Sequence, residues 1–222
     1  MYCMKHMHRT LLAAVALAVS SVTASAETIT EPLGGDIQAA IDSAAAGDTI
    51  QLEAGTYEIS QTLFVTVPLE IVGAGDVDPK ATSVIDAGRR CRIILADADL
   101  EIRDLVLQNG MVGFPTRYTD DEKPGDSDPD GDPCDFEPLD DGGDDGGGIF
   151  ASGSLVMHGC HIVGCRSSSY GGGLFARGNV TLVDCVLQDN AAAYGGGILS
   201  DVDSNQFEIS MIGCTFESLS AC

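Results

Sequence analysis

The sequence Gly146-Gly147-Gly148-Ile149-Phe150 returns twice further along the chain, as Gly171-Gly172-Gly173-Leu174-Phe175 and as Gly195-Gly196-Gly197-Ile198-Leu199. The first glycines of successive copies are 25 and 24 residues apart. A cysteine follows the glycines in each unit, and these cysteines are Cys160, Cys185 and Cys214. A repeat of this length indicates similar structural units that stack on one another.

Apolar and polar residues alternate on both sides of each cysteine. In the second unit Val180 and Leu182 precede Cys185, and Leu187 follows it. Alternation with period two is typical of β-strands, so each unit is predicted to hold two or three short strands. Stacked units of this kind form a parallel β-solenoid, with equivalent residues roughly 4.8 Å apart. We therefore expect ladders of equivalent side chains: one of Leu155, Val180 and Ile209, and another of the three cysteines.

The triple glycines are predicted to lie where the backbone turns with positive φ, or where no side chain fits. Ahead of the repeats, Asp36–Ala46 is predicted to form a short amphipathic helix that starts at Asp36, ends at Gly47 and covers the N-terminal end of the core. Its apolar face consists of Ile37, Ala40, Ile41 and Ala44. Strands are predicted after it at Thr49–Leu52, Ala54–Tyr57, Leu63–Val65, Leu69–Gly73, Ser83–Asp86, Arg92–Leu95 and Leu100–Gly110.

The first 26 residues are interpreted as a secretory signal peptide of bacterial type. After a basic start, Leu11–Val19 is an apolar run and Ala24-Ser25-Ala26 fits a small-residue cleavage site. The run is far shorter than the roughly 20 residues that a membrane-spanning helix needs. We therefore predict an exported protein, secreted or at the cell surface, whose residues 27–222 form one solenoid domain without a transmembrane segment.

The charge of the chain is strongly acidic. It has 34 acidic and 11 basic residues, and without residues 1–26, which hold two of the basic ones, the net charge is −25. Such a surface repels nucleic acid, anionic membranes and other polyanions unless a cation bridges them. We expect no nucleic-acid partner, although the charge can equally serve solubility alone.

The seven cysteines after residue 26 permit disulfides in an exported protein. For the three repeat cysteines, small buried side chains are favoured over disulfides between coils, because an odd number leaves one thiol unpaired. A zinc site is disfavoured, because no Cys-x-x-Cys occurs and His158 and His161 flank Cys160 on opposite sides of a predicted strand.

Two stretches resemble known families. Asp36–Tyr57, with the sequence Asp-Ile-Gln-Ala-Ala-Ile-Asp-Ser-Ala-Ala-Ala-Gly-Asp-Thr-Ile-Gln-Leu-Glu-Ala-Gly-Thr-Tyr, resembles the opening of pectin-lyase-like right-handed β-helix proteins. Cys185-Val186-Leu187-Gln188-Asp189-Asn190 followed by Gly195-Gly196-Gly197-Ile198 is similar to the repeat of polymorphic outer-membrane proteins, which pairs a Phe-x-x-Asn motif with a Gly-Gly-Ala-Ile-like one.

The chain departs from that repeat at several positions. Leu187 stands for the Phe, Cys165 and Leu219 stand where Asn190 does, and Gly replaces Ala. The resemblance covers essentially all of 27–222 and implies an all-β fold, a right-handed parallel β-helix (solenoid) with a short N-terminal capping helix. It implies no single function, because that fold carries lyases, hydrolases, adhesins and structural proteins.

An acidic segment at about 112–145 interrupts the repeats and is predicted to form an external loop, because it is too polar to bury. Within it, 126–137 fits the Asp-x-Asp-x-Asp-Gly-x5-Glu spacing of a calcium loop. The expected ligands of this calcium site are Asp126, Asp128, Asp130, Asp132 through its carbonyl, and Glu137. A solvated acidic loop is the alternative, since no amphipathic helices flank the segment and Pro133 interrupts it.

No catalytic residue is predicted. Asp184 and Asp189 are interpreted as solvent-facing, and the basic residues of the repeats, Arg166 and Arg177, are expected to lie far from any acidic cluster. The favoured function is that of an exported, non-catalytic protein that binds extracellular polysaccharide or another surface component, as in adhesion. The alternative is a polysaccharide lyase or glycoside hydrolase. No C-terminal cap is evident, so an open last coil is expected, through which copies could associate end to end.

Overall fold

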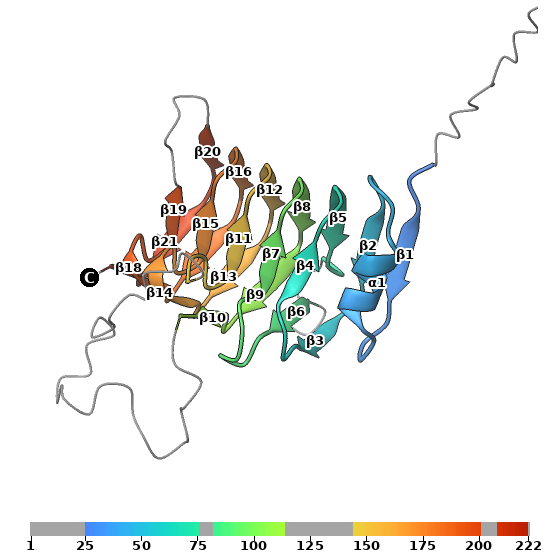
Figure 1. Cartoon of the computed structure of the whole chain (residues 1–222), viewed down its shortest axis with the longest axis horizontal. Helices are drawn as coiled ribbons and strands as arrows, with labels where there is room; N and C mark the ends of the chain where they lie inside the picture. Colours follow the sequence, from blue (N-terminus) through green and yellow to red (C-terminus); the bar gives the residue numbers. More distant parts are fainter. Residues whose placement is uncertain (1–24, 76–81, 114–143, 201–207, 222) are drawn as a thin grey trace, which may run out of the picture.

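The computed structural model describes residues 25–75, 82–113, 144–200 and 208–221. In these residues the chain is all-β apart from one helix, and its strands form four parallel sheets that run side by side along one axis (Figure 1). We name the sheets A to D.

Sheet A consists of β1 (Thr28–Glu31), β2 (Thr49–Leu52), β5 (Leu69–Val72), β8 (Leu100–Arg103), β12 (Leu155–His158), β16 (Val180–Val183) and β20 (Ile209–Ile212). Sheet B consists of β3 (Gly55–Glu58), β6 (Ser83–Asp86), β9 (Leu105–Gln108), β13 (His161–Val163), β17 (Val186–Gln188) and β21 (Thr215–Glu217). Sheet C consists of β4 (Leu63–Val65), β7 (Ile94–Ala96), β11 (Ile149–Ala151), β15 (Leu174–Ala176) and β19 (Ile198–Ser200). Sheet D consists of β10 (Met111–Val112), β14 (Arg166–Tyr170), β18 (Ala191–Tyr194) and β22 (Ser220–Ala221).

The chain visits these sheets in a fixed order. From β8 onward it passes through sheets A, B, D and C and then returns to A one strand further along. From β2 to β7 the coils do the same without a strand in sheet D, and the next strand after β1 is its neighbour β2 in sheet A, with no strand in sheet B or C between them. Every pair of neighbouring strands is parallel, so the described residues form the stacked coils of a β-solenoid.

The predicted ladders are confirmed. Leu155 pairs in register with Val180, and Val180 with Ile209. The three cysteines also occupy equivalent positions, because the residues that follow them, His161, Val186 and Thr215, are in register. The five cysteines of the described residues are free thiols, and they are Cys91, Cys160, Cys165, Cys185 and Cys214. Cys160 and Cys185 are buried in the wall of the core as small side chains, as expected, whereas Cys214 on the last described coil is partly exposed.

The triple glycines have both predicted roles, a positive φ at one position and a close approach of the backbone at another. Gly171, the first of its triplet, has φ +64°, in the left-handed region that only glycine enters without strain. Gly172 has no such φ, but a Cβ there would lie 2.4 Å from the carbonyl oxygen of Ala191 on the next coil. The glycines thus turn the chain and let successive coils approach closely.

The N-terminal helix α1 (Ile37–Ser43) is shorter than predicted. Asp36 caps it by accepting a hydrogen bond from the Ala39 N–H, and its buried face includes Ile37 and Ile41. The helix ends at Ser43 rather than at Gly47, which instead donates its N–H to the Pro68 carbonyl in the turn before β2. Helix α1 lies at the end of the stack beside β4 (Figure 1).

The opposite end of the described stack is less covered. Ile209, Met211 and Phe216 continue the inward ladders but are 38%, 48% and 42% exposed. Their equivalents one coil earlier, Val180 and Leu182 among them, are fully buried.

Two expectations concern residues outside the described ranges. Nearly all of the predicted signal peptide and most of the acidic segment fall there. Among the residues that are described, no helix has the length and hydropathy that a membrane crossing requires.

Candidate functional site

A row of aromatic side chains lies where the glycine turns meet sheets C and D. Phe150 and Phe175 are in register on β11 and β15, between residues that face the core, so their rings point outward. Tyr170 and Tyr194 are in register at the ends of β14 and β18. The ring centroids are 5.3 Å apart for the phenylalanines and 5.2 Å for the tyrosines, and Tyr170 lies 6.2 Å from Phe175. We call these four residues the aromatic strip.

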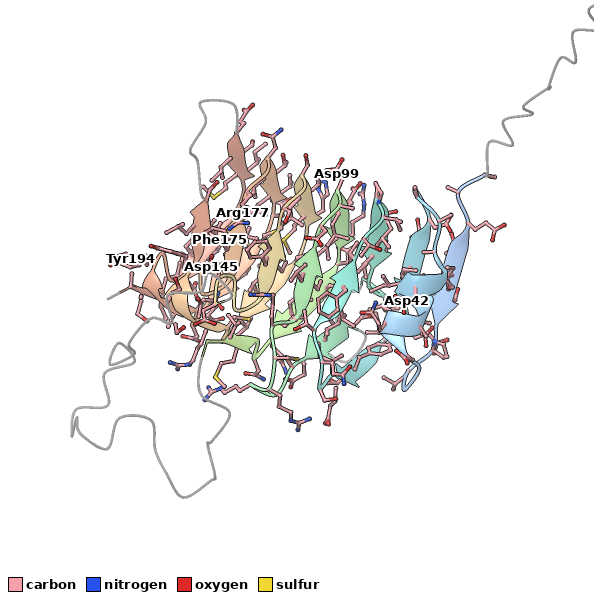
Figure 2. All side chains as sticks on the ribbon, viewed as in Figure 1. Asp42, Asp99, Asp145, Phe175, Arg177 and Tyr194 are labelled. Carbon is pink, nitrogen blue, oxygen red and sulfur yellow. The ribbon has the colours of Figure 1, made fainter. Side chains whose placement is uncertain are left out.

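The strip is buried at one end and open at the other. Phe175 is 2% exposed, whereas Tyr170 and Tyr194 are 40% and 54% exposed. Tyrosine has an apolar ring and a polar hydroxyl, so it can contact a ligand at a partly hydrated surface. The tyrosine end is therefore the part that a ligand can contact directly, and Figure 2 shows Tyr194 at the margin of this face.

Two arginines lie over the phenylalanine rings. The Arg92 guanidinium is 5.4 Å from the Phe150 centroid, and that of Arg177 is 5.1 Å from Phe150 and 5.8 Å from Phe175. At these distances the ring faces attract the cations. Arg177 directly follows β15, so the coil itself fixes where its side chain starts.

Two acidic residues lie directly before the first glycine triplet. Asp144 and Asp145 are 7% and 4% exposed, although the acidic segment was predicted to be external up to Asp145. Hydrogen-bond donors on sheet D explain this burial: the Ser168 hydroxyl donates to the Asp144 carboxylate over 3.1 Å, and the Ser167 hydroxyl donates to the Asp144 carbonyl.

The backbone of the same turn is held by Arg92. Its Nε donates to the carbonyls of Asp145 and Gly146 over 3.1 and 3.0 Å, and its Nη2 donates to the Asp145 carbonyl over 2.6 Å. Burial lowers the pKa of Arg92, and the charges of Asp145 and Asp144 oppose that shift.

Asp145 is the unusual group of the site. Burial raises the pKa of its carboxyl, while hydrogen bonds from Ser169 and from the backbone of Tyr170 and the charges of Arg177 and Arg92 act in the opposite direction. Its Oδ1 is buried and has no hydrogen-bond partner. Arg177 was expected to lie far from any acidic cluster; this is wrong, because its charge acts on Asp145 and both residues lie on this face, with Phe175 between them in the view of Figure 2.

Apart from the aromatic strip, a shallow groove of about 390 Å³ lies on the outer face of sheet A. Leu69 and Leu100 contribute its apolar part, and Glu70 and Glu101 are among its acids. Arg103 binds both of these carboxylates, at 2.6 Å in the case of Glu70. This groove is the weaker candidate, because two of its three acids, Glu70 and Glu101, are already paired with Arg103.

The predicted calcium ligands Asp126, Asp128, Asp130, Asp132 and Glu137 all lie outside the described residues. In the part of the chain that is described, no three His, Cys, Asp or Glu side chains come together in a way that could hold a metal ion. Calcium binding therefore stays a prediction, and a calorimetric titration of chelator-treated protein with calcium at millimolar concentration tests it.

Asp184 and Asp189 have the role that the sequence suggested. Both are exposed, with φ +52° and +55°, so they form corners between strands. Asp and Asn tolerate this left-handed conformation better than most residues, and glycine takes the same corner one coil earlier, at Gly159 and Gly164.

The aromatic strip and Asp145 were missed in the sequence. The available signal was their place relative to the glycines: Asp145, Tyr170 and Tyr194 each directly precede a triplet, and both phenylalanines end the five-residue motif. Comparison of the chain with models of protein families, with curated proteins and with solved structures found no match.

Proposed function

We propose that this protein is an exported, non-catalytic β-helix protein that binds an extended glycan through the aromatic strip. The observation that carries the proposal is the exposed pair Tyr170 and Tyr194, stacked on successive coils of a rigid solenoid. Sugar rings have apolar faces and hydroxyl edges, and tyrosine offers a matching combination of ring and hydroxyl. A solenoid repeats such a surface along its axis, which suits a polymer.

The finer description of the fold belongs to the same proposal. Parallel strands joined by crossovers are right-handed in about 98% of cases, and the resemblance to pectin-lyase-like proteins implies the same hand. We therefore infer a right-handed β-helix that acts outside the cell, secreted or at the cell surface, after removal of residues 1–26.

The test uses the full mature chain and a panel of soluble glycans. Tyr194→Ala is expected to weaken binding about two- to tenfold, since an aromatic contact contributes roughly 0.5–1.5 kcal/mol. Phe64→Ala is the matched control, because Phe64 is an aromatic residue 50% exposed on β4, outside the strip. Isothermal titration calorimetry measures both. Equal losses in the two variants, or no loss in Tyr194→Ala, contradict the proposal.

One observation favours the enzyme as second candidate. Burial shifts the pKa of Asp145 upward, the direction that a general acid needs, and Asp144 is next to it in sequence. The carboxyl groups of Asp144 and Asp145, however, are each hydrogen-bonded by a serine hydroxyl of β14, which holds them in place within the turn. Release of unsaturated uronides or of reducing sugar from the same panel, abolished by Asp145→Asn, would identify a lyase or hydrolase in place of a binding protein.

We also propose that copies of the chain associate end to end through the last coil. Support comes from Ile209, Met211 and Phe216, which occupy inward positions and are exposed, and from the strand edges of β20 to β22. Sedimentation velocity over a range of concentrations is expected to show dimers that Met211→Lys removes. A monomer at all concentrations contradicts this part of the proposal.

A further inference from the structure

Asp145, Tyr170 and Tyr194 form one column along the solenoid. Each directly precedes a glycine with positive φ, at Gly146, Gly171 and Gly195. The backbone confirms the alignment, because the N–H of Gly146 donates to the Tyr170 carbonyl over 2.8 Å and that of Gly171 donates to the Tyr194 carbonyl over 2.9 Å. On the coil before that of Tyr170, a carboxyl group therefore occupies the position that a tyrosine occupies on each of the next two coils.

One oxygen of the Asp145 carboxyl group, Oδ1, is buried without a hydrogen bond. The residue is 4% exposed, and Oδ1 has no partner. Buried polar atoms in proteins nearly always have one, so an unpaired oxygen beside an aromatic surface points to a partner that the chain does not supply.

We propose that the ligand of the aromatic strip is an uncharged, hydroxyl-rich glycan, and that Asp145 determines this specificity by hydrogen-bonding one of its hydroxyl groups through Oδ1. This inference rests on the proposed glycan-binding function. The hydroxyl donates to Oδ1 when the carboxyl is ionised, and it can also accept from the carboxyl when that group is protonated. Burial, which raises the pKa of Asp145, favours the protonated form and so moves to higher pH the range in which the carboxyl can donate to the hydroxyl.

The charges around the site disfavour a carboxylated glycan. Arg92 already donates to the carbonyls of Asp145 and Gly146, and Arg177 lies over the rings of Phe150 and Phe175 and acts on Asp145. The two arginines are thus engaged within the site. A uronate would bring its negative charge beside Asp144 and Asp145 in a chain of net charge −23.

Access to Oδ1 requires a side-chain rearrangement at the surface. Tyr170 follows Asp145 in the column on the next coil and is 40% exposed, and rotamer changes of exposed side chains are fast, so a change of its rotamer can supply this rearrangement. A sugar ring held against Tyr170 and Tyr194 would then place a hydroxyl over the carboxyl one coil below.

The experiment compares matched glycans that differ only in charge. Soluble β-1,4-glucan, β-1,4-mannan and β-1,3-glucan oligosaccharides are each titrated against the full mature chain beside the same oligosaccharide oxidised at C6 to the uronate. We expect at least one neutral oligosaccharide to bind about tenfold or more tightly than its uronate.

Three variants assign the preference to Asp145. Asp145→Ala removes the hydrogen bond and is expected to weaken neutral binding about tenfold. Asp145→Asn keeps a hydrogen-bonding oxygen without the charge, so neutral binding should stay within about threefold while the ratio of neutral to uronate affinity falls. Asp189→Asn, at an exposed corner outside the strip, is the control and should leave both affinities unchanged.

The outcomes separate the two proposals. A wild-type chain that binds no glycan overturns the proposed function and this inference with it. Binding of glycans with equal or better affinity for the uronates, or an unchanged ratio in Asp145→Asn, overturns the inference alone. Circular dichroism and thermal melting establish that each variant is folded, and if Asp145→Ala is not, the ratio measured with Asp145→Asn decides.

Discussion

Single buried polar residues hold successive coils together. Asn190 is fully buried between two coils, where its Nδ2 donates to the Ile162 carbonyl and its Oδ1 accepts from the Cys165 N–H, both over 2.9 Å. Its side chain therefore satisfies two backbone groups that the turn between sheets B and D leaves free. Cys165 and Leu219 occupy the equivalent positions of the neighbouring coils, as the repeat predicted.

We predict that Asn190→Ala destabilises the protein by about 2–4 kcal/mol, because two buried backbone groups lose their partner and each costs roughly 1–3 kcal/mol. Urea unfolding at equilibrium measures the change. Asn179→Ala is the control, because Asn179 is exposed and accepts a single bond from the Glu208 N–H. A loss for Asn190→Ala no larger than that of the control would show that the turn does not depend on this side chain.

The thiols give a second prediction at the scale of single residues. Cys165 is fully buried, and burial raises the pKa of its thiol to about 12, whereas Cys214 on the last described coil is partly exposed. Only the thiolate reacts with an alkylating reagent. In the native protein we expect Cys214 to be alkylated well before Cys165, which should stay unmodified up to about pH 9, since that pH is far below its pKa.

Mass mapping of peptides after timed alkylation measures this order. Urea should abolish the difference, because unfolding exposes Cys165 and restores an ordinary pKa. Native alkylation of Cys165 at the rate of Cys214 would mean that the wall of the core opens readily.

At the scale of the element, the glycine turn combines two separate constraints. Gly171 supplies a positive φ, and Gly172 supplies close approach, with no room for a Cβ between the Ala191 and Gly196 carbonyls. Gly172→Ala is expected to cost about 3 kcal/mol, at the upper end of the range for overpacking. Gly47→Ala should cost only about 1–2 kcal/mol, because Gly47 has φ +91° but open space around it.

Thermal and urea unfolding of the two variants separate the constraints. A larger loss for Gly47→Ala than for Gly172→Ala would indicate that backbone conformation, rather than the contact between coils, explains the triplets.

The elements that sequence could predict are those that repeat. Alternating apolar residues predicted β2, β4 and β6 with their observed bounds, because each strand has one buried face. The helix end was wrong, since Gly47 serves a turn after the helix and its hydrogen bond goes to Pro68 on a different coil. Tertiary contacts of this kind leave no periodic signal.

The candidate site was harder to predict for the same reason. Tyr170, Phe175 and Arg177 come from one coil, but Arg92 and Asp145 join them from segments far apart in sequence. The burial of Asp145 in particular depends on donors in β14, so composition alone predicted an exposed acid. The repeat predicts which equivalent residues of successive coils are in contact. It does not predict which outward-facing side chains from different strands come together at a turn.

At the scale of the whole molecule, stability depends on how many neighbours each coil has. In stacked repeats each unit contacts only the units beside it, so stability is approximately a sum of unit and interface contributions. In the described chain the middle coils have a neighbour on both sides, and their inward residues Leu155, Val180 and Leu182 are fully buried. The coil of β20 and β21 pairs on one side only.

Hydrogen exchange should therefore vary along the solenoid axis. Amide protons of β12 and β16 are expected to exchange through openings whose free energy is close to that of global unfolding. Those of β20 and β21 are expected to exchange through local openings of much lower free energy. The reason is that this coil packs on a neighbour on one side only and that Met211 and Phe216 are already 48% and 42% exposed, so less apolar burial holds it in place than holds a middle coil.

Exchange measured by mass spectrometry at several denaturant concentrations tests this gradient. If the openings of β20 and β21 depend on denaturant as strongly as those of β12, the stack unfolds as one cooperative unit. If they do not, the last coil separates first, and the exposed ladder residues become the part of the molecule where an added neighbour, such as a second copy, would slow exchange most.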